Sequence, residues 1–220
     1  MTARRRERDG LFVDVAADKA RVAPAAIVAN HGSTMYGLVN KAIEELVFTR
    51  FGEETWAKIR ERAGIEVGGF MSMDPYPDAV TYRMVFAASE VLGVPVASLL
   101  EAFGEYWMLY TAREGYGELI TMFGSSLGEF LGNLDNMHTR VGLSFPELQP
   151  PSFVARELGP DRYALEYHST RDGLAPMVVG LLKGLARSFG ESVEVVHAHA
   201  RATHGYDLFH LQVGRGAAAE

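Results

Sequence analysis

The spacing of apolar residues divides the chain into a helical part and a part with strand-like alternation. Between residues 36 and 51, apolar side chains recur at the intervals of a helix that buries one face, and Gly52 closes this helix. Similar signals predict helices over 53–63, 78–92, 95–112, a short stretch ending at residue 123, and 126–142, with a loop over 68–78. The chain is therefore expected to be mainly helical from residue 36 to about residue 142.

The pattern changes after Phe145. Three prolines disfavour helix there, namely Pro146, Pro150 and Pro151. Beyond them the chain predicts strands over 153–158 and 162–169, a helix over 173–189, and a hairpin of 192–200 with 206–213 around His204-Gly205. The expected fold class is α+β, with a helical N-terminal half followed by a four-stranded antiparallel sheet and one crossing helix.

Composition narrows the functional classes. The chain has 220 residues, 48% of them apolar, which suits one or two domains with a sizeable core. Its net charge of −7 argues against binding to nucleic acid or to anionic membranes. The absence of cysteine excludes disulfides, cysteine-ligated metals and a cysteine nucleophile. No apolar run approaches the length of a membrane span, so we expect a cytoplasmic protein.

The first 34 residues differ from the rest of the chain. They carry six basic and four acidic side chains, and a loop-like run from Asn30 to Thr34 leads directly to Met35. We expect residues 1–34 to be an N-terminal extension, either poorly ordered or forming a weakly docked helix over 15–29. The alternative is that Met35 is the biological start of the protein.

His138 is the first candidate for chemistry. In the helix predicted over 126–142 it shares one face with an apolar stripe at spacings of three and four residues, formed by Leu127, Leu131, Leu134 and Val141. One interpretation is a core histidine that donates to a backbone carbonyl. The other is a metal ligand, and a lone axial histidine in an apolar pocket suits heme iron.

A second candidate lies at the end of the strand predicted over 162–169. Tyr167, Ser169 and Arg171 alternate along the chain, so extended geometry would place them on one face, about 6.6 Å apart. Two hydroxyls and a guanidinium fork can clamp carboxylates, and a heme carries two propionates. The alternative is an ordinary polar outer face of an edge strand.

A third constellation suggests different chemistry. His197 and His199 alternate on one predicted strand, and His210 lies on its hairpin partner. Two histidines at i and i+2 with a third across the hairpin can bind zinc and leave one coordination position open. The competing function is therefore a zinc-dependent enzyme. A solvated sheet face would explain the same histidines, and a heme-free interaction domain is a further alternative.

Four motifs, in order and at matching spacings, resemble the heme nitric oxide/oxygen-binding (H-NOX) family, which also forms the heme domain of the soluble guanylate cyclase beta subunit. The likeness runs from Met35 to about Val213. The motifs are Met35-Tyr36-Gly37-Leu38-Val39-Asn40, Asn133-Leu134-Asp135-Asn136-Met137-His138, Pro150-Pro151-Ser152-Phe153 and Tyr167-His168-Ser169-Thr170-Arg171. The domain would then cover residues 35–214, with 215–220 as a tail.

The resemblance implies the roles of individual residues. His138 would be the axial ligand of heme b, which would lie between the helical half and the sheet. The Tyr-x-Ser-x-Arg motif of Tyr167, Ser169 and Arg171 would hold the propionates, and Pro151 would press on the porphyrin. Four residues fall where the family lines its gas-side pocket: Val39, Ile43, Trp107 and Met177.

The gas-side residues bear on ligand selectivity. H-NOX proteins that hold oxygen resemble one another in a distal tyrosine, and this sequence offers Met177 or, by an ungapped alignment, Pro176 at that place. Neither side chain donates a hydrogen bond. We therefore expect a ferrous heme sensor that binds NO and CO and excludes O₂. We expect no catalytic activity, with signalling to a separate partner such as a histidine kinase or a cyclic-di-GMP enzyme.

Overall fold

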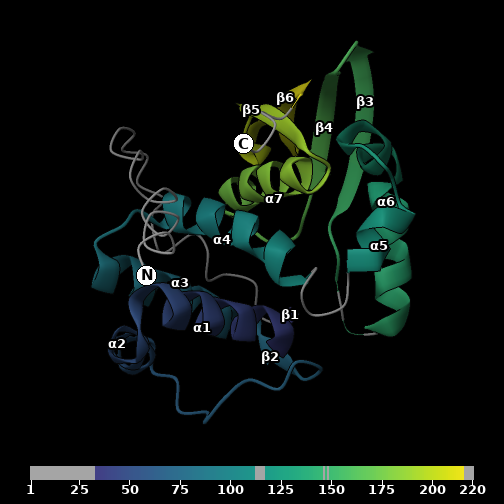
Figure 1. The fold of residues 1–220 in the computed structure, drawn as a ribbon. Helices are drawn as coiled ribbons and strands as arrows, with labels where there is room; N and C mark the ends of the chain where they lie inside the picture. Colours follow the sequence, from purple (N-terminus) through teal and green to yellow (C-terminus); the bar gives the residue numbers. More distant parts are fainter. Residues whose placement is uncertain (1–32, 112–116, 146, 148, 216–220) are drawn as a thin grey trace, which may run out of the picture. The chain divides into compact units, whose positions relative to one another are not determined.

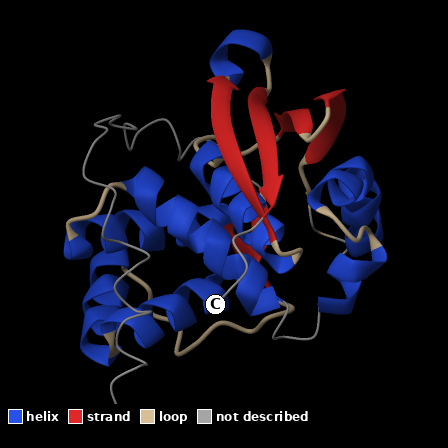
Figure 2. Ribbon diagram, turned by 45° about the horizontal axis from the view of Figure 1, so that its top comes forward, coloured by secondary structure: helices blue, strands red, loops and turns tan. Residues whose placement is uncertain are grey.

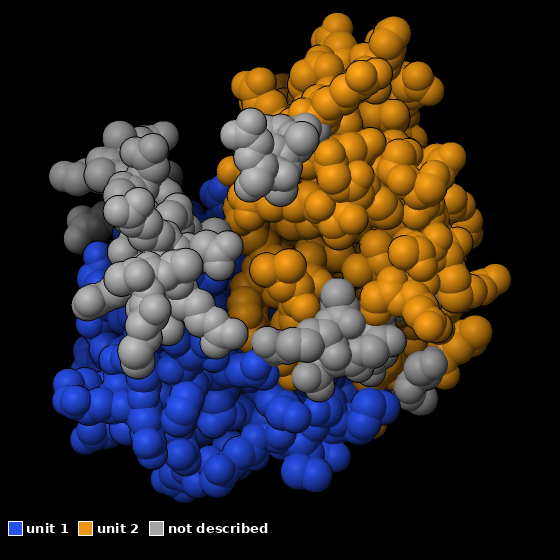
Figure 3. Space-filling model, viewed as in Figure 1, with its two compact units in different colours: residues 1–103 blue, residues 104–220 orange. Residues whose placement is uncertain are grey.

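A computed structural model describes residues 33–111, 117–145, 147 and 149–215 of the chain. The chain forms two compact units, Met1–Phe103 and Gly104–Glu220, which Figure 3 shows in different colours. Residues 1–32 of the expected N-terminal extension lie outside the described residues. Within the described part, Ser33 is buried and Thr34 begins the first strand.

The first unit is mainly helical, as the apolar spacing predicts. Its elements are β1 (Thr34–Tyr36), α1 (Gly37–Phe51), α2 (Glu53–Ala63), β2 (Pro75–Pro77), α3 (Asp78–Leu92) and the beginning of α4 (Val96–Thr111). The predicted helix ends at Gly52 and Gly64 are confirmed, and both glycines have positive φ angles, 85° and 62°. Glycine adopts this conformation without the strain that a Cβ would add.

The β1–β2 ribbon corrects the sequence analysis, which assigned 68–78 to a loop. β1 and β2 pair antiparallel, with Met35 opposite Tyr76. The backbone just before β2 supplies a hydrogen-bond acceptor for the first residue of α1, because Gly37 N donates to Asp74 O at 2.8 Å. A Cβ at Gly37 would lie only 2.0 Å from Met71 O, so this close approach requires glycine.

The second unit contains the sheet. Its elements are α5 (Gly117–Met122), α6 (Leu127–Ser144), β3 (Ser152–Gly159), β4 (Arg162–His168), α7 (Ala175–Ser188), β5 (Glu191–His199), α8 (Arg201–His204) and β6 (Asp207–Arg215). The four strands are antiparallel in the order β3-β4-β6-β5, and α7 packs on the sheet (Figure 1). The predicted α+β class and four-stranded sheet are confirmed.

One face of this sheet forms an apolar core with α6 and α7. The buried members of the core are Phe123, Leu127, Phe130, Leu131, Leu134, Leu165, Tyr167, Ala175, Val178, Leu182, Leu185, Ala186, Phe209 and Leu211. Along each strand, alternate residues point into this core, as the twofold repeat of a strand requires. The core therefore fixes which face of α6 and which face of β4 point inward.

Two details of the second unit differ from prediction. The β5–β6 hairpin contains the short helix α8 at its tip, which ends at Gly205 in the left-handed conformation (Figure 2). β4 ends at His168, so Ser169 and Arg171 lie beyond the strand.

In the described part of the chain no single helix is long and apolar enough to cross a membrane. The pair α3 and α4 reaches that length and composition together, but it is bent by 113°.

Candidate functional site

Helix α6 presents His138 on the side of the apolar core. The helix begins at a cap in which Ser126 accepts a hydrogen bond from Glu129 N, a common device for the first turn. From there Leu127, Leu131 and Leu134 are buried in the core, and His138 is half-buried one turn further along. The predicted stripe is confirmed as far as Leu134, and it directs His138 inward.

The hydrogen bonding of His138 determines which ring nitrogen is available. Nδ1 lies 2.9 Å from Leu134 O. A carbonyl oxygen only accepts, so Nδ1 carries the proton and Nε2 keeps its lone pair. Burial lowers the pKa of His138, while the bond to Leu134 and the charge of Asp135 act in the opposite direction. The lowered pKa favours the neutral form of the ring, which is the form that a metal ion binds.

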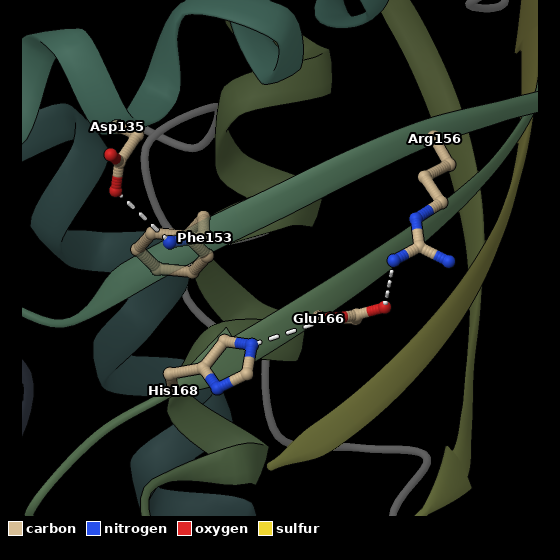
Figure 4. A network of polar contacts seen from close by, with 5 residues as sticks. All are labelled: Asp135, Phe153, Arg156, Glu166 and His168. Atoms are coloured by element: carbon tan, nitrogen blue, oxygen red, sulfur yellow. Dashed lines mark hydrogen bonds and ion pairs between the residues drawn. The ribbon is translucent and has the colours of Figure 1, made fainter.

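Phe153 links α6 to the strand that carries Tyr167. Its ring centroid lies 5.2 Å from that of His138 and 5.3 Å from that of Tyr167, and Phe153 and Tyr167 are register partners on β3 and β4. Its backbone nitrogen donates to Asp135 Oδ1 at 3.2 Å, as Figure 4 shows. The His138 ring and the Tyr167 ring thus both lie next to the ring of Phe153.

Tyr167, Ser169 and Arg171 are close together, but not as the extended face that the sequence predicted. Because β4 ends at His168, the chain bends beyond it, and Arg171 N donates back to Ser169 Oγ at 3.0 Å. Burial raises the pKa of the Tyr167 hydroxyl, while its hydrogen bond with Ser169 and the positive charge of Arg171 lower it. The bend thus joins Ser169 to Tyr167 on one side and to the Arg171 backbone on the other.

Arg171 is buried, with 7% of its surface exposed, which is rare for an arginine. Its Nη1 donates to Gln149 O at 2.9 Å, at the approach to β3. Pro151 is half-buried next to this position, directly before β3. A buried guanidinium group carries a positive charge and planar donors, which suit it to binding an anionic group.

The four predicted gas-side residues lie on three helices. Val39 and Ile43 lie on α1 in the first unit, where Ile43 is buried and lines an apolar hollow. Trp107 and Met177 lie on α4 and α7 in the second unit. Both of these side chains are partly exposed, and the Trp107 ring stacks on that of Tyr110 at 6.0 Å. A shared role for the four as one pocket stays a prediction.

The α4–α7 contact depends on small residues near Met177. A Cβ at Gly104 would lie 2.3 Å from Met177 O, so only glycine lets the two helices approach this closely. Arg187 Nη1 and Glu105 Oε2 form an ion pair at 2.6 Å further along the same two helices. The backbone at Met177 is therefore packed directly against α4.

The predicted zinc triad is wrong. His197 lies opposite Phe209 and stacks on its ring at 4.9 Å, whereas His210 lies opposite Val196, so the two point to opposite faces of the sheet. A register shift between His197 and His199 breaks the alternation that the prediction assumed. Among the described residues, no three His, Cys, Asp or Glu side chains form a group that could hold a metal ion.

The chemistry of the remaining donor set suits a heme. The iron needs one neutral imidazole nitrogen from the protein, which His138 Nε2 can supply. The propionates need hydrogen-bond donors and positive charge, which Tyr167, Ser169 and Arg171 can supply. These two sets are connected through Phe153.

Comparison with known proteins decides the family. A family model described as haem-NO-binding matches residues 36–197. This chain belongs to the haem-NO-binding (H-NOX) family. Members of this family are heme-binding gas-sensor domains, so the zinc-enzyme alternative finds no support in the comparison either.

Solved H-NOX structures share the fold of the chain. An H-NOX protein from S. oneidensis, in the Fe(II)NO ligation state, has a TM-score of 0.75 at 20% identity and covers 82% of this chain and 100% of its own. An unliganded Fe(II) H-NOX protein from K. algicida has a TM-score of 0.74 at 21% identity, with 84% and 100% coverage. At these identities the likeness concerns the fold.

The curated relatives are much longer proteins. Soluble guanylate cyclase gcy-32 of Caenorhabditis elegans is 33% identical over 156 residues, covering 70% of this chain and 23% of the relative. Soluble guanylate cyclase gcy-31 of the same organism is 25% identical over 177 residues, covering 80% and 25%. The chain thus spans about a quarter of the length of these relatives.

Two residues of the site were not singled out from the sequence. Phe153 is the last residue of the proline-containing motif and the second residue of β3, and Asp135 lies one turn before His138 on α6. The signal for Phe153 was an aromatic residue at the inward position of a strand. The motif around His138 includes Asp135 but does not predict its contact, because its partner is a backbone nitrogen 18 residues away.

Proposed function

We propose that this H-NOX domain senses NO and CO through a ferrous heme b bound by His138. The observation that carries the proposal is the orientation of His138, whose Nδ1 donates to Leu134 O and leaves Nε2 as a metal-binding lone pair. The hydrogen bond to Leu134 O also orients the imidazole ring, so His138 is positioned as a ligand before any metal binds. Such preorganisation is typical of metal-binding histidines.

The proposed propionate site is the bend after β4. Arg171 would pair with a carboxylate through its fork, and Ser169 and Tyr167 would donate from their hydroxyl groups. Burial of Arg171 strengthens such a pairing, because the surrounding dielectric is lower than that of water. Pro151, next to the Gln149 carbonyl that holds Arg171, would contact the porphyrin.

The heme iron, when present, would supply the binding position for a diatomic gas. Selectivity would come from the gas-side residues Val39, Ile43, Trp107 and Met177. Bound O₂ draws negative charge and is stabilised by a hydrogen-bond donor, whereas NO and CO depend much less on one. Met177 and its neighbour Pro176 have no donor group. We therefore propose that the protein binds NO and CO and does not retain O₂.

The proposed output passes through α6 to a separate protein. His138 and Asp135 lie on this helix, and Asp135 also binds the backbone of Phe153 at the start of β3. A change in the position of His138 would therefore displace both α6 and the edge strand β3. A histidine kinase or a cyclic-di-GMP enzyme in the cytoplasm that prefers one of the two arrangements would read the signal.

Visible spectroscopy of the purified protein tests the proposal. We expect a red protein with a strong Soret band that shifts when NO or CO is added to the reduced form. A colourless protein that takes up no added hemin would contradict the proposal. A spectrum with heme that does not respond to NO would refute the sensing function while leaving heme binding intact.

A further inference from the structure

The tip of the β5–β6 hairpin contacts the bend that carries Ser169 and Arg171. Asp207, the first residue of β6, is buried, and its Oδ1 accepts hydrogen bonds from His197 Nε2 at 2.8 Å and from Arg201 N at 3.2 Å. One carboxylate oxygen thus joins β5, the start of α8 and β6. The hairpin tip is fixed around this single acceptor.

Arg201 extends from the hairpin tip to the bend. Its Nη1 forms an ion pair with Asp172 Oδ1 at 2.8 Å and lies 3.4 Å from Arg171 O. The Arg201 side chain is two-thirds buried, whereas that of Asp172 is largely exposed, so one side of this pair is well shielded from solvent. The pair holds the backbone directly next to the buried Arg171.

Asp207 also lies beside Tyr167. The two residues are register partners on β6 and β4, and side chains of paired residues point to the same face of a sheet. The negative charge of Asp207 acts on the Tyr167 hydroxyl, raising its pKa, and the positive charge of Arg201 opposes it. Two members of the proposed propionate site, Tyr167 and Arg171, are therefore next to this network.

We infer that Arg201 and Asp207 are positioning residues that hold the Tyr167–Ser169–Arg171 bend in the conformation that binds the propionates. The inference rests on the proposed function of that bend. Its physical reason is the end of β4 at His168: beyond that point the strand ladder no longer fixes the chain. The Arg201–Asp172 ion pair and the Asp207 carboxylate then hold the bend in one conformation. Residues that surround a metal or ligand site commonly orient its binding groups in this way.

Hydrogen exchange of the heme-free, full-length chain tests the positioning directly. The amide of Arg171 is the reporter, because it donates to Ser169 Oγ within the bend. We expect its exchange to be about tenfold faster in Arg201→Ala and Asp207→Ala. Asp207→Asn keeps an acceptor oxygen for Arg201 N and His197, so it should stay near the wild-type rate. If Asp207→Ala does not fold, Arg201→Ala alone decides the result.

Arg156→Ala is the matched control. Arg156 forms an ion pair with Glu166 at 3.0 Å, as Figure 4 shows. Glu166 precedes Tyr167 on β4, so its side chain points to the opposite face of the sheet. This variant should leave Arg171 exchange unchanged. Unchanged exchange in Arg201→Ala, or equal acceleration in Arg156→Ala, would overturn the inference, because the first shows no positioning and the second shows only general loosening.

Heme loss to excess apomyoglobin links the network to the proposed function. Arg201→Ala should lose heme about tenfold faster than the wild type. If Arg171→Ala speeds heme loss but Arg201→Ala does not, the inference is overturned. If Arg171→Ala itself leaves heme loss unchanged, the proposed propionate site is wrong, and the exchange measurement still decides whether Arg201 holds the bend.

Discussion

The ring of Phe153 packs against the ring of His138, with 5.2 Å between centroids and 35° between planes. The two residues come from different elements, α6 and β3, and Asp135 joins these elements a second time through Phe153 N. We therefore expect a displacement of His138 to act on β3 as well as on its own helix. The proposed iron ligand, His138, is thus connected to the sheet through Phe153.

The first prediction concerns the proposed ligand. His138→Gly should abolish the wild-type ferrous spectrum, because no side chain then offers Nε2 at this position, and imidazole added to the solution should restore it. The measurement is the Soret spectrum of the reduced protein with and without imidazole. His210→Ala, on the outer face of β6, is the control and should behave as the wild type. A wild-type spectrum in His138→Gly without imidazole would show that another residue is the ligand.

The second prediction concerns the propionate site. Arg171→Ala removes a charged donor, which is worth about 1.5–3 kcal/mol, so heme loss should be about ten- to a hundredfold faster. Arg171→Lys keeps the charge without the planar fork and should be intermediate. Because Arg171 also donates to Gln149 O, thermal unfolding of the apoprotein should be compared. Heme loss at the wild-type rate in a folded Arg171→Ala protein would remove the assignment.

The third prediction uses two glycines of α6. A Cβ at Gly128 would lie 2.2 Å from Tyr163 Oη, whereas one at Gly132 would meet nothing within 4 Å. Gly128→Ala should leave the fold less stable than Gly132→Ala does, because the Tyr163 side chain must move aside to make room for the new Cβ. Gly132→Ala should stabilise it by about 0.5–1 kcal/mol, because alanine costs less backbone entropy in a helix. Urea unfolding measures both, and equal effects in the two variants would contradict this packing of α6 on β4.

The predictable parts of the fold share strong local signals. Helices α1 and α2 end at Gly52 and Gly64, and both ends could be predicted because glycine there follows an apolar helical repeat. The ribbon of β1 with β2 could not. Three residues carry no detectable alternation, and β2 begins and ends with proline, which lacks a donor and is typical of loops. Only pairing with a distant segment makes these residues strands.

The candidate site shows the same limit. The stripe that directs His138 inward could be read from helical periodicity, since it depends on one element. The zinc triad could not be judged, because the register shift between His197 and His199 is set by pairing with β6. The bend at Ser169 likewise results from the end of β4, which the sequence placed one residue later. Arg201 and Asp207 carry no local signal, since their partners come from other elements.

The last prediction concerns gas selectivity. The reduced wild-type protein should bind NO and CO and form no lasting complex with O₂ in air. The reason is that the side chains of Met177 and Pro176 have no hydrogen-bond donor for bound O₂. Met177→Tyr adds a phenolic donor on α7, where the backbone is packed against Gly104, and should gain O₂ binding. Among the four proposed gas-side residues, Trp107, which stacks on Tyr110, has a side-chain donor in its indole N–H. Trp107→Phe should therefore leave the wild-type behaviour unchanged. Spectra recorded in air decide: stable O₂ binding by the wild type would contradict the prediction, and its loss in Trp107→Phe would identify the indole as the donor.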